Sequence, residues 1–325
     1  MRGAGILGAL LAAGILASLA IGDVTIGPAD LWAGLWTSEG PGALTLRVIR
    51  GPRVATALGA GALLGLSGAL LQALLRNPLA APDLLGFNSG AGLAIVCGVA
   101  FGIAVPAPVL AAAGGIAAAV LMALLAWRPG HPTSTLTLIL VGLGVGFSTG
   151  AVGSFLLLTL PVTQAAEAQR WLTGSLAARN WGHAGQVFGL GAVLCLAAAL
   201  QVRSLKLLEL GPDLAAGLGL RAERARLGVS ATAVLLAAAA VAVAGPVPFV
   251  ALMAAPLGAV LTGARRPEAR LAAAAGAGAV ICVFADLVAR AAIPGLQLPV
   301  GVMTGALGAP YLLWRLSREM ERGEL

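Results

Sequence analysis

Long intervals without Asp, Glu, Lys or Arg recur along the whole sequence, and they constrain the fold more than any other feature. A helix needs about 20 apolar residues to cross the hydrocarbon core of a bilayer, so each interval of that length predicts a membrane-spanning helix. The predicted spans are 3–22, 54–75, 84–127, 129–169 apart from an acid at 167, 180–202, 227–264, 269–285 with a charged tail, and 291–314.

Two of these intervals are too long for one helix. The interval 84–127 is twice the needed length and has Pro106 and Pro108 at its middle, which predicts two helices joined by a tight turn. The interval 227–264 is shorter and is interrupted by prolines, which predicts one full helix and one short or broken helix. The sequence therefore predicts an all-α polytopic membrane protein with about ten transmembrane helices, folded as a single domain over 1–325.

The composition excludes the main soluble classes. Hydrophobic residues make up 59% of the 325 positions and charged residues 10%, whereas a soluble domain carries about 25% charged residues. Disorder needs low hydrophobicity, and three cysteines are too few for a disulfide scaffold. The net charge of +7 does not indicate nucleic-acid binding, because the basic residues are scattered between apolar runs rather than gathered on one surface.

The basic residues also predict the orientation of the chain, since Lys and Arg collect in cytoplasmic loops. With the N-terminus inside, fourteen basic residues fall in inside segments and six in outside segments. Both termini are therefore expected in the cytoplasm. The six outside residues are Arg47, Arg50, Arg53, Arg170, Arg179 and Arg290.

The residues that an enzyme needs are missing. A phosphate-binding P-loop requires Gly-Lys followed by Ser or Thr, but the one lysine, Lys206, follows a leucine. His131 and His183 are predicted on opposite sides of the membrane, so they cannot share a metal site. An ion-coupled carrier needs an ionisable group inside a span, and Asp286 is the single acid within a predicted apolar helix. We expect Asp286 to pair with Arg290 within its helix at the water interface instead.

Small residues recur on two predicted helices. Residues of this kind let helices approach closely, and we expect close packing for most of them. The alternative is that some leave room for a wide substrate path. One set, which recurs every four residues along one face, is Gly142, Gly146 and Gly150. The other set lies close together on a second helix and consists of Gly59, Gly61, Gly65 and Gly68.

The largest predicted inside loop, 203–226, has leucines at helical intervals among its charges, with Gly211 and Pro212 as punctuation. Asp213 stands near a second helix start, so the loop predicts two short amphipathic helices on the cytoplasmic surface. Their leucine faces are suited equally to lipid headgroups and to a groove on a protein partner.

A set of short segments spreads over nearly the whole chain. The segments run from Arg50 to Arg53, Leu66 to Gln72, Arg76 to Ala80, Pro82 to Gly86, Trp171 to Leu176, Ala216 to Gly219, Ala244 to Pro246, Leu298 to Gly301 and Gly308 to Pro310. In order and spacing this set resembles the FecCD-type permeases of bacterial ABC importers, which carry ferric siderophores, haem or cobalamin.

This resemblance implies an assembly. A subunit of this family pairs with a second permease chain, the same or a paralogue, above two cytoplasmic ATPases that bind the ATP and Mg, so that the permease itself holds no cofactor and is not an enzyme. The resemblance also implies a periplasmic substrate-binding protein outside and a place in the bacterial inner membrane. Transport is then expected to proceed by alternating access of a path between the two permease chains.

The resemblance assigns roles to particular residues. The segment 204–226 matches the family's coupling helices, which gives Gly211, Asp213, Ala215, Leu218 and Gly219 as ATPase-contact candidates. Outer arginines of the family pair with acidic residues of the binding protein, and the helix that begins near residue 135 matches the one that lines the path. The docking candidates are Arg50, Arg53 and Arg290, and the path candidates are Gly142, Gly146 and Gly150.

One departure from the family pattern affects the expected pairing. Family members commonly carry Pro-His with a basic residue three positions later, whereas this chain reads Ala-Pro-Leu-Gly-Ala at 255–259. The missing groups favour pairing with a different permease chain. The stretches Gly86 to Asn88 and Leu125 to Arg128 resemble the catecholate-siderophore branch most, with haem and cobalamin permeases as alternatives. An ion-coupled secondary transporter and a membrane scaffold are the competing readings from other classes.

Overall fold

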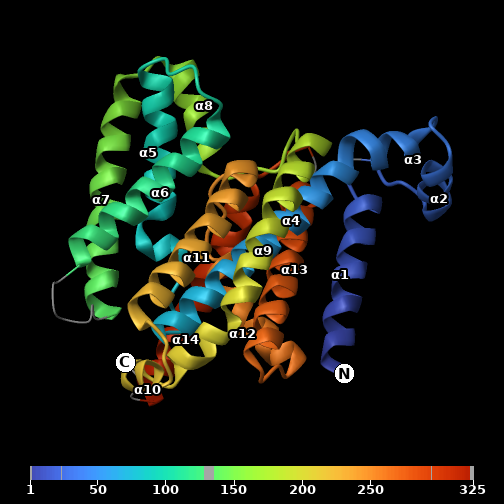
Figure 1. The fold of residues 1–325 in the computed structure, drawn as a ribbon. Coiled ribbons are helices and arrows are strands. Elements are labelled where there is room, and N and C mark those ends of the chain that lie inside the picture. Colours follow the sequence, from blue (N-terminus) through green and yellow to red (C-terminus); the bar gives the residue numbers. More distant parts are fainter. Residues whose placement is uncertain (1, 23, 128–134, 294, 323–325) are drawn as a thin grey trace.

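The computed structural model describes residues 2–22, 24–127, 135–293 and 295–322, and all regular structure in those residues is helical (Figure 1). Ten helices occupy the predicted spans: α1 (Arg2–Ala20), α4 (Arg50–Leu75), α5 (Phe87–Ala100), α6 (Ala107–Ala126), α7 (Thr135–Thr159), α9 (Trp181–Glu209), α11 (Ala222–Ala244), α12 (Val250–Thr262), α13 (Pro267–Ala291) and α14 (Val300–Arg322). Short helical segments connect them: α2 (Pro28–Trp36), α3 (Pro41–Leu44), the π-helical η1 (Thr45–Ile49), the 3₁₀ turn η2 (Pro82–Leu85), α8 (Val162–Leu172) and α10 (Pro212–Gly217).

Seven of these helices are long and apolar enough to cross a membrane by length and composition, among the residues described. Two more, α5 and α12, are apolar but have only 14 and 13 residues. The break between α5 and α6 follows the prolines of the long interval, and α12 is the predicted short helix that contains Pro256. The prediction of an all-α polytopic membrane protein is confirmed.

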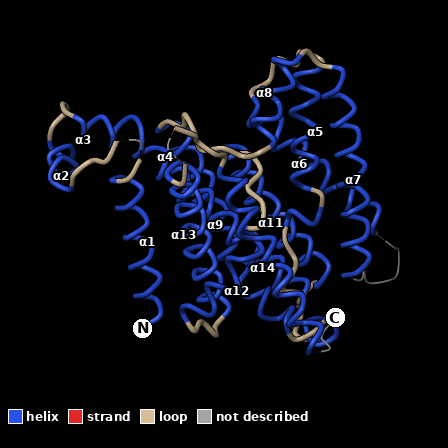
Figure 2. Tube along the Cα trace, turned by 180° about the vertical axis from the view of Figure 1, so that it is seen from behind, coloured by secondary structure: helices blue, strands red, loops and turns tan. Residues whose placement is uncertain are grey.

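Both termini lie at one end of the bundle (Figures 1 and 2), and α10 lies beside the C-terminal end (Figure 1). The segments α2, α3 and α8 lie at the opposite end. We call the end with the termini the inner end, after the orientation that the charges predict, and the other the outer end.

The centre of the fold is α4, which packs against α9, α11, α12 and α13. Small residues make these contacts possible, because a side chain added at Gly61 would meet the backbone carbonyl of Gly278 on α13. Gly65 approaches the carbonyl of Ala274 on the same helix in the same way. Close packing is therefore the role of these glycines, as expected for membrane helices.

The periphery of the bundle is apolar. On α7, Phe147 is 75% exposed and Leu158 is 87% exposed, and on α9 Leu200 is 76% exposed. A water-soluble protein rarely presents so much contiguous apolar surface. The exposed apolar faces of α7 and α9 are therefore surfaces for lipid or for another membrane chain.

Candidate functional site

A short exposed helix, α10, stands at the inner end between α9 and α11 (Figure 1). Gly211 and Gly219 flank it with φ angles of 111° and 82°, a region that glycine enters without steric cost. After α10, the Gly219 N–H donates to the Ala216 carbonyl and the Leu220 N–H donates to the Ala215 carbonyl, both at 2.9 Å. This is the Schellman ending of a helix, and it fixes α10 as a defined turn.

The side chains of α10 divide between the body and the surface. Ala215 is fully buried against the bundle, whereas Leu214 and Leu218 are each 62% exposed, and Gly219 is exposed beside them. Asp213 lies within α10, but its side chain is outside the described part of the structure. The result is a small apolar projection at the inner end, with geometry suited to a groove on a partner.

The loop that leads to α10 differs from the sequence-based expectation. The prediction of two short amphipathic helices over 203–226 is wrong for the first, because α9 continues without interruption to Glu209. Leu205 and Leu208 explain this, since both are buried and extend the packed face of α9 beyond the predicted end of the span. Only α10 is a separate helix, and α11 begins at Ala222.

Ion pairs connect the inner end of α9 to the start of α13. Lys206 Nζ lies 3.0 Å from Glu268 Oε2, and Arg270 Nη1 lies 3.6 Å from Glu209 Oε1. Arg76, at the end of α4, donates from Nη2 to the Leu208 carbonyl at 2.6 Å. The helix α9, which leads into α10, therefore contacts both α4 and α13 at its inner end.

The predicted outer arginines lie together, but they point into the protein. Arg53 donates to Asp286 from Nε and Nη2 at 2.8 to 3.0 Å, in a fork that holds both carboxylate oxygens. Arg50 donates from Nη1 to the Leu19 carbonyl at 2.8 Å, and Arg290 donates from Nη1 to the Ile21 carbonyl at 2.6 Å. The three arginines thus bind α4 and α13 to the outer end of α1.

The expectation for Asp286 needs correction. Its principal partner is Arg53 of α4, whereas Arg290 Nε lies 3.7 Å from the carboxylate within the same helix. Asp286 is only 1% exposed, so the pair is buried rather than at a water interface. The sequence could not reveal this contact because Arg53 and Asp286 are 233 positions apart.

The three path candidates on α7 have different surroundings. Gly142 is buried, with its carbonyl against Gly86, and Gly146 faces Gly86 and Ser89 of the neighbouring α5 region. Gly150 is exposed, and a side chain added there would meet nothing within 4 Å. The first two therefore have a packing contact, and Gly150 opens onto the exposed face of α7.

Sequence reasoning gave no role to Asp83, which joins two breaks in the helical bundle. From η2 its carboxylate accepts the Phe249 N–H at 2.9 Å and the Asn88 side-chain amide at 2.8 Å. Phe249 precedes α12 and has a φ of 65°. The signal for this residue was an acid in a Pro-Asp pair directly before an apolar helix. Asp83 thereby connects the turn before α5 to the turn before α12.

No group of three or more potential metal ligands occurs among the described residues. His183 lies at the start of α9 as part of a capping box with Asn180, and His131 lies outside the described residues. Burial lowers the pKa of Arg179, in the turn before α9, from its ordinary value.

These features define the class: a polytopic, helical membrane protein with a small apolar projection, α10, at its inner end. Residues 10–318 match the FecCD transport family, and the chain belongs to that family of transport permeases. It is 40% identical to the ferric enterobactin transport system permease protein FepG of Escherichia coli K12, over 98% of this chain and 96% of that protein. It is 35% identical to the achromobactin transport system permease protein CbrC of Dickeya dadantii, over 95% and 89%. A solved metal-chelate type ABC transporter in an inward-facing conformation superposes with a TM-score of 0.76 at 26% identity, over 96% and 97%.

Proposed function

We propose that this chain is the permease subunit of an ATP-driven importer that moves an iron(III)–siderophore complex across the bacterial inner membrane. The observation that carries the proposal is the 40% identity to the ferric enterobactin permease over 98% of the chain. A catecholate siderophore is the substrate that this similarity favours. ATP and Mg bind to a separate cytoplasmic ATPase pair in this proposal, which rests on membership of the FecCD transport family.

The proposed mechanism is alternating access. The ATPases close on ATP and move α10, and the ion pairs of α9 with α13 pass this movement into the bundle. A second permease chain, the same or a paralogue, completes the path along α7. A periplasmic binding protein delivers the chelate at the outer end.

The coupling step is tested at α10. Leu218→Asp places a charge on the exposed apolar projection, so we expect loss of ATPase binding and of uptake, with normal membrane insertion. Leu218→Met is the matched control, because it keeps an apolar side chain of similar volume at the same exposed position. Co-purification of the ATPase with each variant measures the effect. Full ATPase binding by Leu218→Asp would remove α10 from the interface.

The docking proposal depends chiefly on Arg53. Its side chain is 12% exposed, whereas Arg290 is 6% exposed and Arg50 is buried. Arg53→Gln should weaken binding of the acidic binding protein and make that binding less sensitive to salt, because salt screens the charge pairing. Arg47→Gln, at an exposed outer position, is the control for general charge. Unchanged affinity and salt dependence in Arg53→Gln would exclude Arg53 from docking.

The substrate is tested by uptake in cells that lack this chain. The panel contains iron-loaded catecholate and hydroxamate siderophores, haem and cobalamin, and complementation is repeated beside a catalytically dead ATPase. We expect loss of catecholate-iron uptake, restored only with an active ATPase. Loss of haem or cobalamin uptake instead would identify that compound, rather than a siderophore, as the substrate. If the chain restored uptake equally well with the inactive ATPase, an ion-coupled carrier would be favoured and the importer proposal would be overturned.

A further inference from the structure

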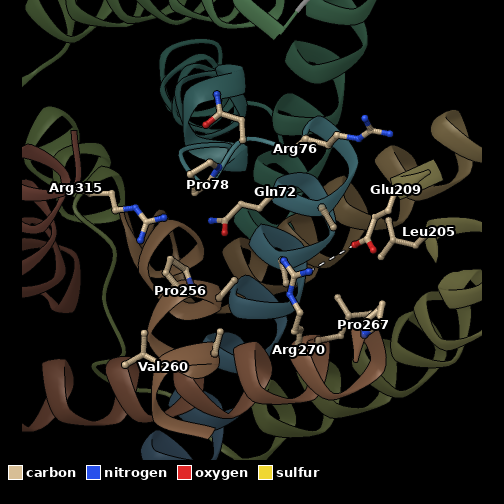
Figure 3. Close-up of a pocket in the computed structure, with 16 residues that line it drawn as sticks. Gln72, Arg76, Pro78, Leu205, Glu209, Pro256, Val260, Pro267, Arg270 and Arg315 are labelled. Carbon is tan, nitrogen blue, oxygen red and sulfur yellow. Dashed lines mark ion pairs between the residues drawn. The ribbon is translucent and has the colours of Figure 1, made fainter. Parts of the chain in front are cut away.

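A cavity of about 740 Å³ opens at the inner end of the bundle (Figure 3). Its walls come from α4, α9, α12, α13 and α14, together with the turn at Asn77 and Pro78. No residue of α7 lines it, so the cavity is separate from the candidate path. Its volume lies within the range of small-molecule sites, about 300–1,000 Å³.

The walls of this inner cavity carry an excess of positive charge. Arg76, Arg270 and Arg315 line it, and Glu209 is the one acid among the lining residues. Arg270 and Arg315 extend toward its centre from opposite sides, with Gln72 between them (Figure 3). The contact of Arg270 with Glu209 is long, at 3.6 Å, and leaves the guanidinium largely available to another acceptor. This arrangement suits an anion.

The start of α13 adds to the positive electrostatic potential of the cavity. Pro267 at the first turn of this 25-residue helix lines the cavity, and the N-cap residue Arg266 makes no side-chain capping bond. Glu268 in the same turn pairs with Lys206 and does not line the cavity. The N–H groups and dipole of a helix N-terminus favour phosphate. The opposite wall is small and apolar, with Ala255, Ala259 and Val260, so it leaves room for a ligand without supplying a competing charge.

The position of the cavity restricts the ligand further. It lies at the end of a membrane-spanning bundle, where phospholipid headgroups and cytoplasmic solutes both have access. Beside it, Arg318 lies 4.8 Å above the ring of Trp314 on α14. An aromatic residue with a basic neighbour is typical of the level of the headgroups.

We propose that this inner cavity binds a phosphate group through Arg270 and Arg315, carried either by an anionic phospholipid or by a soluble phosphate ester. Arginine forks bind phosphate oxygens in pairs, and charge-assisted hydrogen bonds of this kind are the strong ones. No path or docking residue takes part in the site, but Arg270 and Glu209 also form one of the α9–α13 ion pairs of the proposed coupling step, so the test below measures probe binding rather than transport.

The experiment uses the purified full chain in nanodiscs. One arm compares phosphatidylcholine discs with discs that contain phosphatidylglycerol, and the other adds glycerol 3-phosphate to phosphatidylcholine discs. Thermal unfolding and the mass of retained lipid are measured. Stabilisation by phosphatidylglycerol alone identifies the lipid source, and stabilisation by glycerol 3-phosphate identifies the soluble source.

The variant Arg270→Gln with Arg315→Gln should weaken the affinity for the effective probe about tenfold or more, because two charge-assisted contacts are lost. Arg265→Gln with Arg266→Gln is the matched control, since both arginines are exposed at the same end and neither lines the cavity. An equal loss of probe affinity in the two double variants would mean that the total positive charge of the inner end, and not the cavity, binds the probe, and it would overturn the proposal.

A second variant keeps every arginine. Ala259→Phe fills the cavity from α12 and should abolish probe binding while the net charge is unchanged. Wild-type binding by Ala259→Phe, or no stabilisation of the wild-type chain by either probe, would overturn the site. The proposal would also be overturned if the double variant Arg270→Gln with Arg315→Gln altered only the binding of a protein partner and neither phosphate probe had an effect.

Discussion

At the scale of single residues, the clearest feature is one buried carboxylate among three arginines at the outer end. Asp286 is 1% exposed and holds Arg53 in a two-pronged contact at 2.8 to 3.0 Å. Arg50 and Arg290 donate hydrogen bonds to backbone carbonyls at the end of α1. The helix C-terminus itself favours cations, since its last carbonyls lack partners within the helix. The cluster therefore stabilises the junction of three helices.

Removal of the carboxylate tests this role. Asp286→Asn removes the buried counter-charge of Arg53, whose side chain is 12% exposed, and loss of one partner of a buried ion pair costs about 3–5 kcal/mol. We expect a marked fall in the unfolding temperature of the purified chain. Glu268→Gln is the control, because its pair with Lys206 is about half exposed, and solvent-exposed ion pairs contribute little to stability. Equal stability of both variants would mean that the outer cluster does not hold the helices.

At the scale of helices, glycine determines which elements meet. Gly61 and Gly278 each face the other's carbonyl, so α4 and α13 are in backbone contact. The alternation of long and short helices has a local cause too, since prolines end the spans before α6 and interrupt α12. The extension of α9 to Glu209 has a tertiary cause, because Leu205 and Leu208 find a packed surface there.

The α4–α13 contact predicts a strong effect of added volume. Gly278→Leu drives a side chain into the backbone of α4 and should cost at least the upper part of the about 1–3 kcal/mol typical of overpacking. Gly8→Leu on α1 is matched in volume and meets nothing within 4 Å, so it should be neutral. Thermal unfolding and the yield of folded chain in detergent measure both. A neutral Gly278→Leu would contradict the close approach.

At the scale of the whole molecule, the bundle separates an inner end with both termini and α10 from an outer end with α2, α3 and α8 (Figures 1 and 2). The charge distribution predicted this sidedness before any helix was placed. The exposed apolar faces of α7 and α9 then remain for lipid and for a second chain.

The orientation is tested by labelling from one side of intact spheroplasts, in a background with the three cysteines replaced. Ser38→Cys lies in the outer segment between α2 and α3, and Gly217→Cys ends α10 at the inner end; both positions are exposed. A membrane-impermeant maleimide should label Ser38→Cys in spheroplasts and Gly217→Cys only after lysis. The reverse pattern would invert the topology.

The class of fold, the positions of the ten helices and the family all follow from the amino-acid sequence alone. These depend on local quantities, namely the length of apolar intervals, the position of prolines and the order of short motifs. It also located the outer arginines and α10 at opposite ends. Roles in docking, coupling and the path stay predictions at those positions.

Only the tertiary structure decided which residues meet. The pair of Arg53 with Asp286, the bridge from Asp83 to Phe249 and the inner cavity between Arg270 and Arg315 join positions far apart in the chain. The partner of a buried charge depends on which groups lie near it in three dimensions and on how far both are removed from water. The spacing of residues along the sequence gives neither of these quantities.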